Sequence, residues 1–211
     1  MNTNQKNNSG PVSAYLPVKC TVERVTRLTE KERLFRLRPV EGAFVFAPGQ
    51  FFMAGLPGFG EAPFSVAGPC SSNGTGTDNG HGSFEFCIRA VGSLTAALHR
   101  LKKSDTLWVR GPFGKGFDLN ELEGKDILFV AGGIGVVPMR GLIKSILARR
   151  DSFGALTLIY GSKAPDDILF GEELAQWNES GVKTLVTIDT PDDKWNGHTG
   201  VVTTLMPVVQ L

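Results

Sequence analysis

Hydrophobic and polar positions alternate through the first half of the chain, as they do in β-strands that bury one face. Each alternating stretch is short and ends at residues that favour turns, such as Pro48-Gly49 and Pro57-Gly58. The pattern predicts six strands, over residues 18–28, 34–38, 50–56, 64–67, 83–91 and 106–110. Between the last two strands, apolar residues recur at helical spacing from Leu94 to Leu101 and predict one helix. Six short strands separated by turns favour a small antiparallel β-barrel.

The pattern changes after Gly116, where apolar strands alternate with segments of helical periodicity. We therefore expect a domain boundary near residues 119–125, with a barrel domain over residues 15–119 and an α/β domain over residues 120–211. The second domain is predicted to contain strands 127–130, 156–160 and 184–188, followed in turn by helices 137–150, 167–177 and 201–205. Strands and helices in this order form a doubly wound parallel sheet of strand order 3-2-1, which binds ligands at the carboxyl ends of its strands.

Two polar stretches are not expected to contribute to either core. Residues 1–14 are polar and rich in asparagine, and they predict a disordered tail. Residues 71–82, between the fourth and fifth strands, are mostly Gly, Ser, Thr and Asn, so they predict a mobile hairpin loop. No apolar run is long enough to cross a bilayer, and the N-terminus has no apolar signal segment. We therefore expect a cytoplasmic protein without a membrane span.

Composition excludes several classes of function. The 22 basic and 21 acidic residues nearly balance and form no basic block, so nucleic acid is not an expected partner. The three cysteines, Cys20, Cys70 and Cys87, form no Cys-x-x-Cys pair, and the three histidines are scattered. The sequence therefore predicts neither a disulfide framework nor a zinc or iron–sulfur site.

A glycine turn at the start of the α/β domain is the first candidate for ligand binding. Gly132, Gly133 and Gly135 separate the first strand from the following helix. Glycines allow a tight turn and a close approach of the backbone to a ligand, and the free N–H groups of the helix attract an anion such as pyrophosphate. Pro138 occupies the place of the third glycine in the common G-x-G-x-x-G motif. A plain strand-to-helix turn would also use glycines, so the turn alone does not decide between these alternatives.

Four motifs occur in order along the chain: Glu61-Ala-Pro-Phe-Ser-Val66, Arg89-Ala-Val-Gly-Ser-Leu-Thr95, Gly111-Pro-Phe-Gly114 and Gly132-Gly-Ile-Gly-Val-Val-Pro138. With these motifs, residues 15–206 resemble the ferredoxin–NADP reductase superfamily. The chain is most similar to flavin subunits of multi-subunit enzymes, such as the gamma subunits of cytoplasmic sulfhydrogenases and the electron-transfer subunits of dihydroorotate dehydrogenases. The resemblance implies FAD in the barrel domain, NAD(P)H in the α/β domain, and other redox subunits as partners.

The resemblance assigns the flavin ring to Pro63, Phe64, Ser65 and Val66. Phe64 can offer an aromatic face to the ring, and the Ser65 hydroxyl can lie near flavin N5, where hydride arrives. The arginine that grips the flavin pyrophosphate in the family is replaced by Ala62 in this chain. Phe64 could alternatively be a residue of the barrel core.

A second flavin candidate is the segment formed by Arg89, Gly92, Ser93, Leu94 and Thr95. Arg89 brings a fixed positive charge, and the helix start brings free N–H groups and two hydroxyls, so together they can bind a pyrophosphate. A pyrophosphate site favours FAD over FMN, which carries a single phosphate. Ser93 or Thr95 could equally serve as an ordinary helix cap.

The resemblance assigns the pyridine nucleotide to Gly132, Gly133, Ile134, Gly135, Gly161 and Ser162. Asp189 ends the third strand, where a carboxylate can accept hydrogen bonds from both ribose hydroxyls and repels a 2′-phosphate, so NADH is expected over NADPH. Lys163 and Lys194 are cations that a 2′-phosphate could use instead. No side chain is predicted to act as a catalytic acid or base, because the cofactors carry the hydride transfer.

These features predict a flavin-dependent NAD(P)H oxidoreductase module that passes electrons between NAD(P)H and a partner subunit through FAD. The alternative is a subunit kept for assembly or regulation, because Ala62 stands where the family has an arginine. Family members continue with a further strand carrying a Cys-Gly-Pro turn, and complex-forming subunits then add a [2Fe-2S] segment. We therefore expect these 211 residues to be part of a longer chain, to contain no iron, and to leave the edge of strand 127–130 open.

Overall fold

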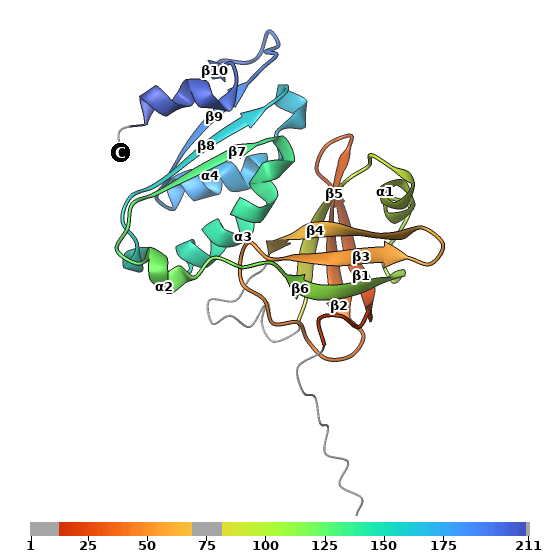
Figure 1. Ribbon diagram of the computed structural model, residues 1–211. Coiled ribbons are helices and arrows are strands. Elements are labelled where there is room, and N and C mark those ends of the chain that lie inside the picture. Colours follow the sequence, from red (N-terminus) through yellow and green to blue (C-terminus); the bar gives the residue numbers. More distant parts are fainter. Residues whose placement is uncertain (1–12, 69–81, 210–211) are drawn as a thin grey trace, which may run out of the picture.

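The computed structural model describes residues 13–68 and 82–209. Its first half is a closed antiparallel barrel, visible in Figure 1, with strand order β1-β2-β5-β4-β3-β6. The strands are β1 (Val18–Arg27), β2 (Glu32–Pro39), β3 (Phe51–Leu56), β4 (Gly60–Gly68), β5 (Phe84–Arg89) and β6 (Thr106–Phe113), and helix α1 (Ser93–Leu98) precedes β6. The six predicted strands and the helix are confirmed. The predicted loop, except for Gly82, and most of the predicted tail lie outside the described residues.

Phenylalanine rings fill the barrel, and they come both from inward-pointing strand residues and from the segment between β2 and β3. The rings of Phe52 and Phe84 are fully buried and stack with centroids 5.5 Å apart. Phe44, Phe46 and Phe86 pack against Phe52 in edge-on or tilted arrangements. Such ring pairs add to the stability that burial of the apolar surface provides. The barrel thus has an aromatic core of its own.

The second half is a parallel sheet with strand order β10-β9-β8-β7. Its strands are β7 (Ile127–Gly132), β8 (Leu156–Ser162), β9 (Val182–Ile188) and β10 (His198–Thr199), and its α-helices are α2 (Leu119–Leu122), α3 (Val136–Leu147) and α4 (Gly171–Glu179). Short 3-10 helices are η1 (Gly133–Gly135), η2 (Arg150–Ser152), η3 (Pro165–Asp167) and η4 (Val202–Val208). The predicted order of the first three strands is confirmed, whereas the two-residue strand β10 is not predicted by the sequence pattern.

Two predicted helices differ from the structure. The helix expected from residue 167 begins at Gly171, because Phe170 takes a left-handed conformation with φ 58° and η3 forms a separate turn before it. The helix expected over residues 201–205 is the 3-10 helix η4, which contains Pro207. Proline lacks a backbone N–H and disfavours the α-helical conformation of the preceding residue, so a regular α-helix is not favoured there.

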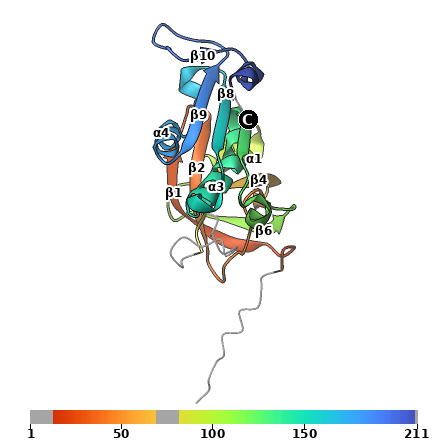
Figure 2. The ribbon, with the colours of Figure 1, turned by 90° about the vertical axis from the view of Figure 1, so that its left-hand side faces the viewer.

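Helices cover both faces of the sheet, and Figure 2 shows α4 and η4 on opposite sides of it. The face toward α3 and α4 carries one apolar cluster that includes Phe129, Leu158 and Trp177. On the other face, Ile159 of the sheet and Leu205 of η4 are buried. No described strand pairs with the outer side of β7, and Val130 on this strand is 46% exposed. The open edge expected for this strand is therefore present in the described part of the chain.

Helix α3 lies between the sheet and the barrel and joins the two halves (Figure 1). Three barrel residues, Leu34, Ala67 and Cys87, belong to the apolar cluster of the second half rather than to the barrel core. They come from β2, β4 and β5, so one face of the barrel packs against the α/β half. Because protein interiors are close-packed, this interface holds the glycine turn before α3 beside the barrel.

Candidate functional site

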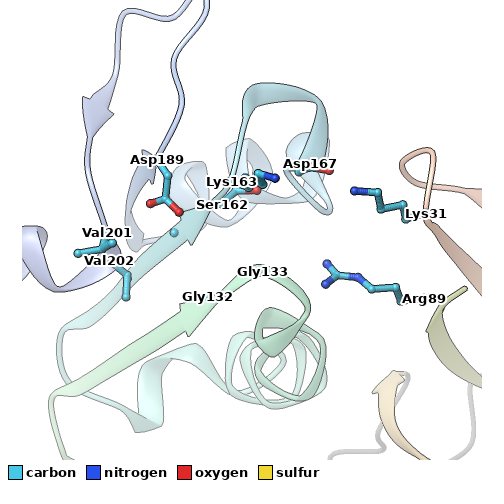
Figure 3. A pocket seen from close by; sticks show the side chains of 11 residues that line it. Lys31, Arg89, Gly132, Gly133, Ser162, Lys163, Asp167, Asp189, Val201 and Val202 are labelled. Atoms are coloured by element: carbon cyan, nitrogen blue, oxygen red, sulfur yellow. The ribbon is translucent and has the colours of Figure 1, made fainter. Parts of the chain in front are cut away.

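A cleft of about 380 Å³ lies between the barrel and the carboxyl ends of β7 and β8. It is lined by Lys31, Arg89, Gly132, Gly133, Gly161, Ser162, Lys163, Asp167, Asp189, Val201 and Val202. Figure 3 shows the two barrel cations reaching toward the glycine turn and the ends of the sheet strands. The structure therefore gathers in one place the sequence-predicted residues Arg89, Gly132, Gly133, Gly161, Ser162 and Asp189.

The glycine turn leaves open space where side chains would otherwise project into the cleft. A Cβ at Gly132 or Gly135 would meet no heavy atom within 4 Å, and a Cβ at Gly133 would lie 3.9 Å from Arg89 Nη2. Gly133 has φ +50°, a left-handed conformation that other residues disfavour. Ile134 is partly buried against the apolar cluster and anchors the turn. Because η1 leads directly into α3, the N–H groups at the start of this helical segment have no partners within it, so the glycine turn can accept an anionic group.

Ser162 ends β8 and contributes a buried hydroxyl to the cleft. Its Oγ has no hydrogen-bond partner of good geometry among the described residues. The Tyr160 hydroxyl is close by: burial raises the pKa of Tyr160, while the Leu169 amide and the Ser162 hydroxyl partly lower it. A buried polar group without a well-formed hydrogen bond costs free energy, so a polar ligand in the cleft would stabilise Ser162.

Arg89 is held by a buried carboxylate on the neighbouring strand β2. Its Nε donates to Glu32, whose other carboxylate oxygen accepts a hydrogen bond from Thr29 Oγ1. Glu32 is 1% exposed, and a buried carboxylate requires such partners. The resemblance assigns Arg89 to the flavin pyrophosphate, but the guanidinium lines the cleft and faces Gly133. Packing of the barrel against α3 brings Arg89 and Lys31 to the same side of the cleft.

Asp189 lies at the far end of the cleft from the two barrel cations. Its amide donates to the Ser162 carbonyl at 3.0 Å, which holds the segment after β9 beside the end of β8. Lys163 also lines the cleft, whereas Lys194 does not. The cleft therefore has two cations on its barrel side and the Asp189 carboxylate at its far end, while Lys163 and Asp167 line it between them.

The β4 residues assigned to the flavin ring lie on both faces of the strand. Ala62, Phe64 and Val66 pack in the barrel core, and the Phe64 side chain is 9% exposed. Pro63 is exposed and Ser65 is half-buried, because successive strand residues point to opposite faces. Phe64 is thus a barrel-core residue, as the alternative interpretation expected, and Ser65 is the polar group on the outer face of β4.

At the start of α1, one of the two hydroxyl groups, that of Thr95, is used in hydrogen bonds to the neighbouring backbone. Thr95 Oγ1 accepts hydrogen bonds from the amides of Val91 and Gly92, each at 2.9 Å, and donates to the Gly92 carbonyl. This is the capping alternative, so the Thr95 hydroxyl has little capacity left for a phosphate. Leu94 is buried in the barrel core, while Ser93 is exposed. Ser93 and the Gly92 backbone are the groups of this segment that remain accessible.

Four cleft residues are not predicted from the sequence: Lys31, Asp167, Val201 and Val202. Asp167 and Val202 follow β8 and β9, so the rule that ligands bind at the carboxyl ends of strands could have included them. Lys31 lies in the turn between β1 and β2, and no local signal connects that turn with the sheet.

The described residues contain no group of three or more His, Cys, Asp or Glu side chains that could hold a metal ion. Burial raises the pKa of both Cys20 and Cys87 to about 12, so neither thiol is ionised at neutral pH. None of the helices in this part of the chain is long and apolar enough to cross a membrane.

Similar proteins are known for both halves. The oxidoreductase NAD-binding domain family matches residues 129–207. Over 187 residues, or 85% of its length, the chain is 37% identical to sulfhydrogenase 1 subunit gamma of Pyrococcus furiosus, and it covers 61% of that protein. Over 70% of its length it is 35% identical to the probable dihydroorotate dehydrogenase B (NAD(+)), electron transfer subunit, of Thermococcus kodakarensis, and it covers 54% of that protein. The structure of a ferredoxin NADP+ reductase from Neisseria gonorrhoeae with bound FAD and NADP superimposes with a TM-score of 0.73 and 19% identity, covering 91% of this chain and 76% of that one.

Residues 129–207 belong to the oxidoreductase NAD-binding domain family, and the chain as a whole has the ferredoxin–NADP reductase fold. The fold predicted from that resemblance, a six-stranded barrel followed by a parallel sheet, is confirmed. The chain spans between 54% and 61% of the length of the two curated relatives named above. Its second half matches the oxidoreductase NAD-binding domain, and the cleft lies along the strand ends of that domain.

Proposed function

We propose that the chain is an FAD-dependent NAD(P)H oxidoreductase module of the diaphorase type, which passes electrons between NAD(P)H and a partner redox subunit. The observation that carries the proposal is the cleft between the halves, where Arg89 of the barrel faces the Gly133 turn of the NAD-binding domain. The two curated relatives are a sulfhydrogenase subunit and an electron transfer subunit, which supports a partner within a multi-subunit complex. The cytoplasmic location expected from the sequence is part of the same proposal.

The cleft residues fit a pyridine dinucleotide. Gly132 and Gly133 leave room for its pyrophosphate at the start of α3, and Arg89 supplies a charge of the required sign. The buried Ser162 hydroxyl would gain a polar partner from the ligand. Asp189 at the far end suits the ribose hydroxyls. A dinucleotide bound in this way would contact both halves and exclude water from between them.

The barrel offers a partial set of contacts for FAD. We propose that the flavin ring lies along β4 near the Ser65 hydroxyl, with its phosphates toward Gly92 and Ser93. A Cβ at Gly92 would meet no heavy atom within 4 Å, so this turn has space for a ligand. Ala62 provides no charge on β4, and the loss of one charge-assisted contact weakens binding by about 2 kcal/mol, or more than tenfold.

The protein's task in this reaction is to bind, align and shield the cofactors. FAD, when bound, accepts hydride from the nicotinamide and releases electrons one at a time to a partner. The residues of the cleft would hold the nucleotide and the outer face of β4 would hold the flavin, which would bring the reacting groups together between the halves. No side chain is required as an acid or base for this transfer.

An absorbance spectrum tests the proposal. Protein reconstituted with FAD and passed through a desalting column should retain flavin absorption, and NADH should bleach that absorption within milliseconds to seconds. A protein that does not retain FAD would overturn the proposal. Bound flavin that NADH cannot reduce would instead support the assembly or regulatory subunit, which the electron-transfer relatives do not favour.

The variant Asp189→Ala should narrow the preference for NADH over NADPH. Without the carboxylate, the ribose loses a hydrogen-bond acceptor and a 2′-phosphate is no longer repelled. We expect the ratio of the two kcat/KM values to shift about tenfold, which corresponds to about 1.4 kcal/mol. Initial rates with both nucleotides measure this ratio, and Asp193→Ala, an exposed position outside the cleft lining, is the control. A wild-type preference for NADPH would contradict the assignment and point to Lys163 or Lys194 as the phosphate partner.

A further inference from the structure

Arg140 joins the two halves through a buried guanidinium group. It lies about one turn into α3, and the residue is 3% exposed. Its Nη1 donates to the Ala67 carbonyl at 2.7 Å and to the Glu85 carboxylate at 2.8 Å, both in the barrel. Its Nε and Nη2 donate to Glu173 of α4 at 2.9 and 2.7 Å. We call this set of contacts the Arg140 clamp, because one side chain binds two barrel strands and a second helix of the α/β half.

The surroundings are shaped to receive this guanidinium. Gly68 has φ +135°, and a Cβ there would lie 3.2 Å from Arg140 Nη1, so the strand end leaves room for the side chain. On the other side, the Phe170 ring centroid lies 4.8 Å from the guanidinium carbon. Glu85 also lies 3.7 Å from Arg36 of β2, so the charged contacts continue from α4 across α3 into the barrel.

The charges of the clamp are mutually dependent. Burial lowers the pKa of Arg140, but its hydrogen bonds and the charges of Glu173 and Glu85 outweigh this effect and raise it. Burial raises the pKa of Glu173, but Arg140 and Lys144 outweigh this effect and lower it. The planar guanidinium has a fixed fork of donors, so it can satisfy acceptors on β4, β5 and α4 together at only one relative position of the two halves.

We propose that Arg140 is a positioning residue that sets the distance between the nucleotide cleft and the flavin strand β4. Ala67 follows Ser65 by two positions on β4, and Arg140 lies one turn after the glycine turn on α3. Their hydrogen bond therefore ties the strand that would carry the flavin ring to the helix whose start would bind the nucleotide. The identity of the two cofactors rests on the proposed function, whereas the clamp rests on the contacts themselves. Hydride transfer needs close, aligned reactants, so a small displacement of one half slows it.

The variant Arg140→Lys tests the geometry while keeping the positive charge beside Glu85. A single ammonium group cannot reach acceptors on two barrel strands and α4 at once. Spin labels at two exposed positions, Lys103→Cys in the barrel and Glu179→Cys on α4, report the distance between the halves in a Cys70→Ser background. We expect one narrow distance distribution in the parent and a broadened one in Arg140→Lys, with or without cofactors. An unchanged distribution would overturn the proposal.

The same variant has a kinetic signature in FAD-loaded protein. We expect the limiting rate of flavin reduction by NADH to fall by about 10- to 100-fold, with smaller changes in FAD affinity and in the KM for NADH. If Arg140 only stabilised the fold, Arg140→Lys would lower the melting temperature, but the distance distribution would stay narrow. The limiting rate of reduction and the KM for NADH would then not change by different factors. The control is Arg149→Lys, since Arg149 also pairs with a carboxylate, Glu123, and lies 5.9 Å from the Phe153 ring, all within the α/β half. It should leave both readouts unchanged.

Gly68→Ala provides a second test that leaves every charge in place. The added methyl group would press on Arg140 Nη1 and must displace either the guanidinium or the end of β4. The distance distribution should broaden as in Arg140→Lys, so the proposal stays testable if one of the two variants fails to fold. If the variants that fold have the same spin-label distance distribution as the parent, Arg140 does not set the relative position of the two halves. Broadened distributions in a protein that binds no flavin would support the clamp and overturn only the proposed function.

Discussion

Gly133→Val is expected to slow the reduction of bound flavin by subsaturating NADH at least about 100-fold while leaving FAD binding unchanged. Gly133 has φ +50°, and a side chain at this position would project toward Arg89 across the cleft. A valine would fill the space proposed for the pyrophosphate and separate it from the backbone N–H groups and the arginine. Losing two charge-assisted hydrogen bonds costs about 3 kcal/mol or more, which is at least about 100-fold in affinity. Stopped-flow mixing of the FAD-loaded variant with NADH measures the rate, and an equilibrium titration with NAD+ measures the binding.

The control for this variant is Gly124→Val. Gly124 also has a left-handed conformation, with φ +72°, and a Cβ there would meet no heavy atom within 4 Å. It lies between α2 and β7, outside the cleft lining. Both variants impose the strain of a β-branched residue at positive φ, so both should lose some stability. Only Gly133→Val should lose the nucleotide, and an equal loss in Gly124→Val would show that backbone strain rather than the cleft is responsible.

Alternation of apolar and polar residues predicts the barrel because most of its strands bury one face only, and β5 shows where this signal is incomplete. Phe84 and Phe86 face the barrel core, as alternation requires. Glu85 and Cys87 point to the other side but are buried as well, because the α/β half covers them. The sequence of β5 alone does not predict that its outer face is buried, because Arg140, the partner of Glu85, comes 55 residues later.

Most of the α/β side of the cleft could be predicted from the sequence, whereas Lys31 on the barrel side could not. Gly132, Ser162 and Asp189 all lie at the ends of parallel strands, where the order of strands and helices already places ligand-binding groups. Lys31 reaches the same cleft only because the barrel closes and then packs against α3. Thr95 illustrates the reverse case, a residue that the sequence predicts as a phosphate ligand. Its hydroxyl is of a suitable type, but it caps its own helix.

Two further differences depend on the pairing between strands, which residue type alone does not determine. The Phe64 ring suits a flavin by its chemistry, but the register of β3 and β4 pairs it with Phe52 and turns it into the barrel core. The strand β10 has only two residues and no periodicity, so it forms by pairing with β9 rather than from a local preference.

Phe52→Ala should destabilise the barrel by about 3–5 kcal/mol. The Phe52 ring is fully buried, and its centroid lies 4.8 to 6.1 Å from four other rings, those of Phe44, Phe46, Phe84 and Phe86. Phe84 and Phe86 are fixed on a closed barrel strand, and Phe44 and Phe46 are buried in the segment between β2 and β3. Rings held in this way cannot readily collapse into the space that the truncated side chain leaves, so most of the cavity should persist. Since a domain is stabilised by only about 5–15 kcal/mol in total, the variant should also release FAD at a lower urea concentration.

Phe59→Ala makes the same chemical change in the same half of the chain, at the tip of the β3–β4 hairpin, where the side chain is 44% exposed. Its cost should stay within about 1 kcal/mol, because little packing is lost at an exposed position. Hydrogen exchange of the β3 and β5 peptides at increasing urea concentration measures the opening of the barrel separately from that of the α/β half. If Phe52→Ala costs no more than Phe59→Ala, the aromatic cluster does not determine the stability of the barrel, and its closure must depend instead on the contacts that β4 and β5 make with α3.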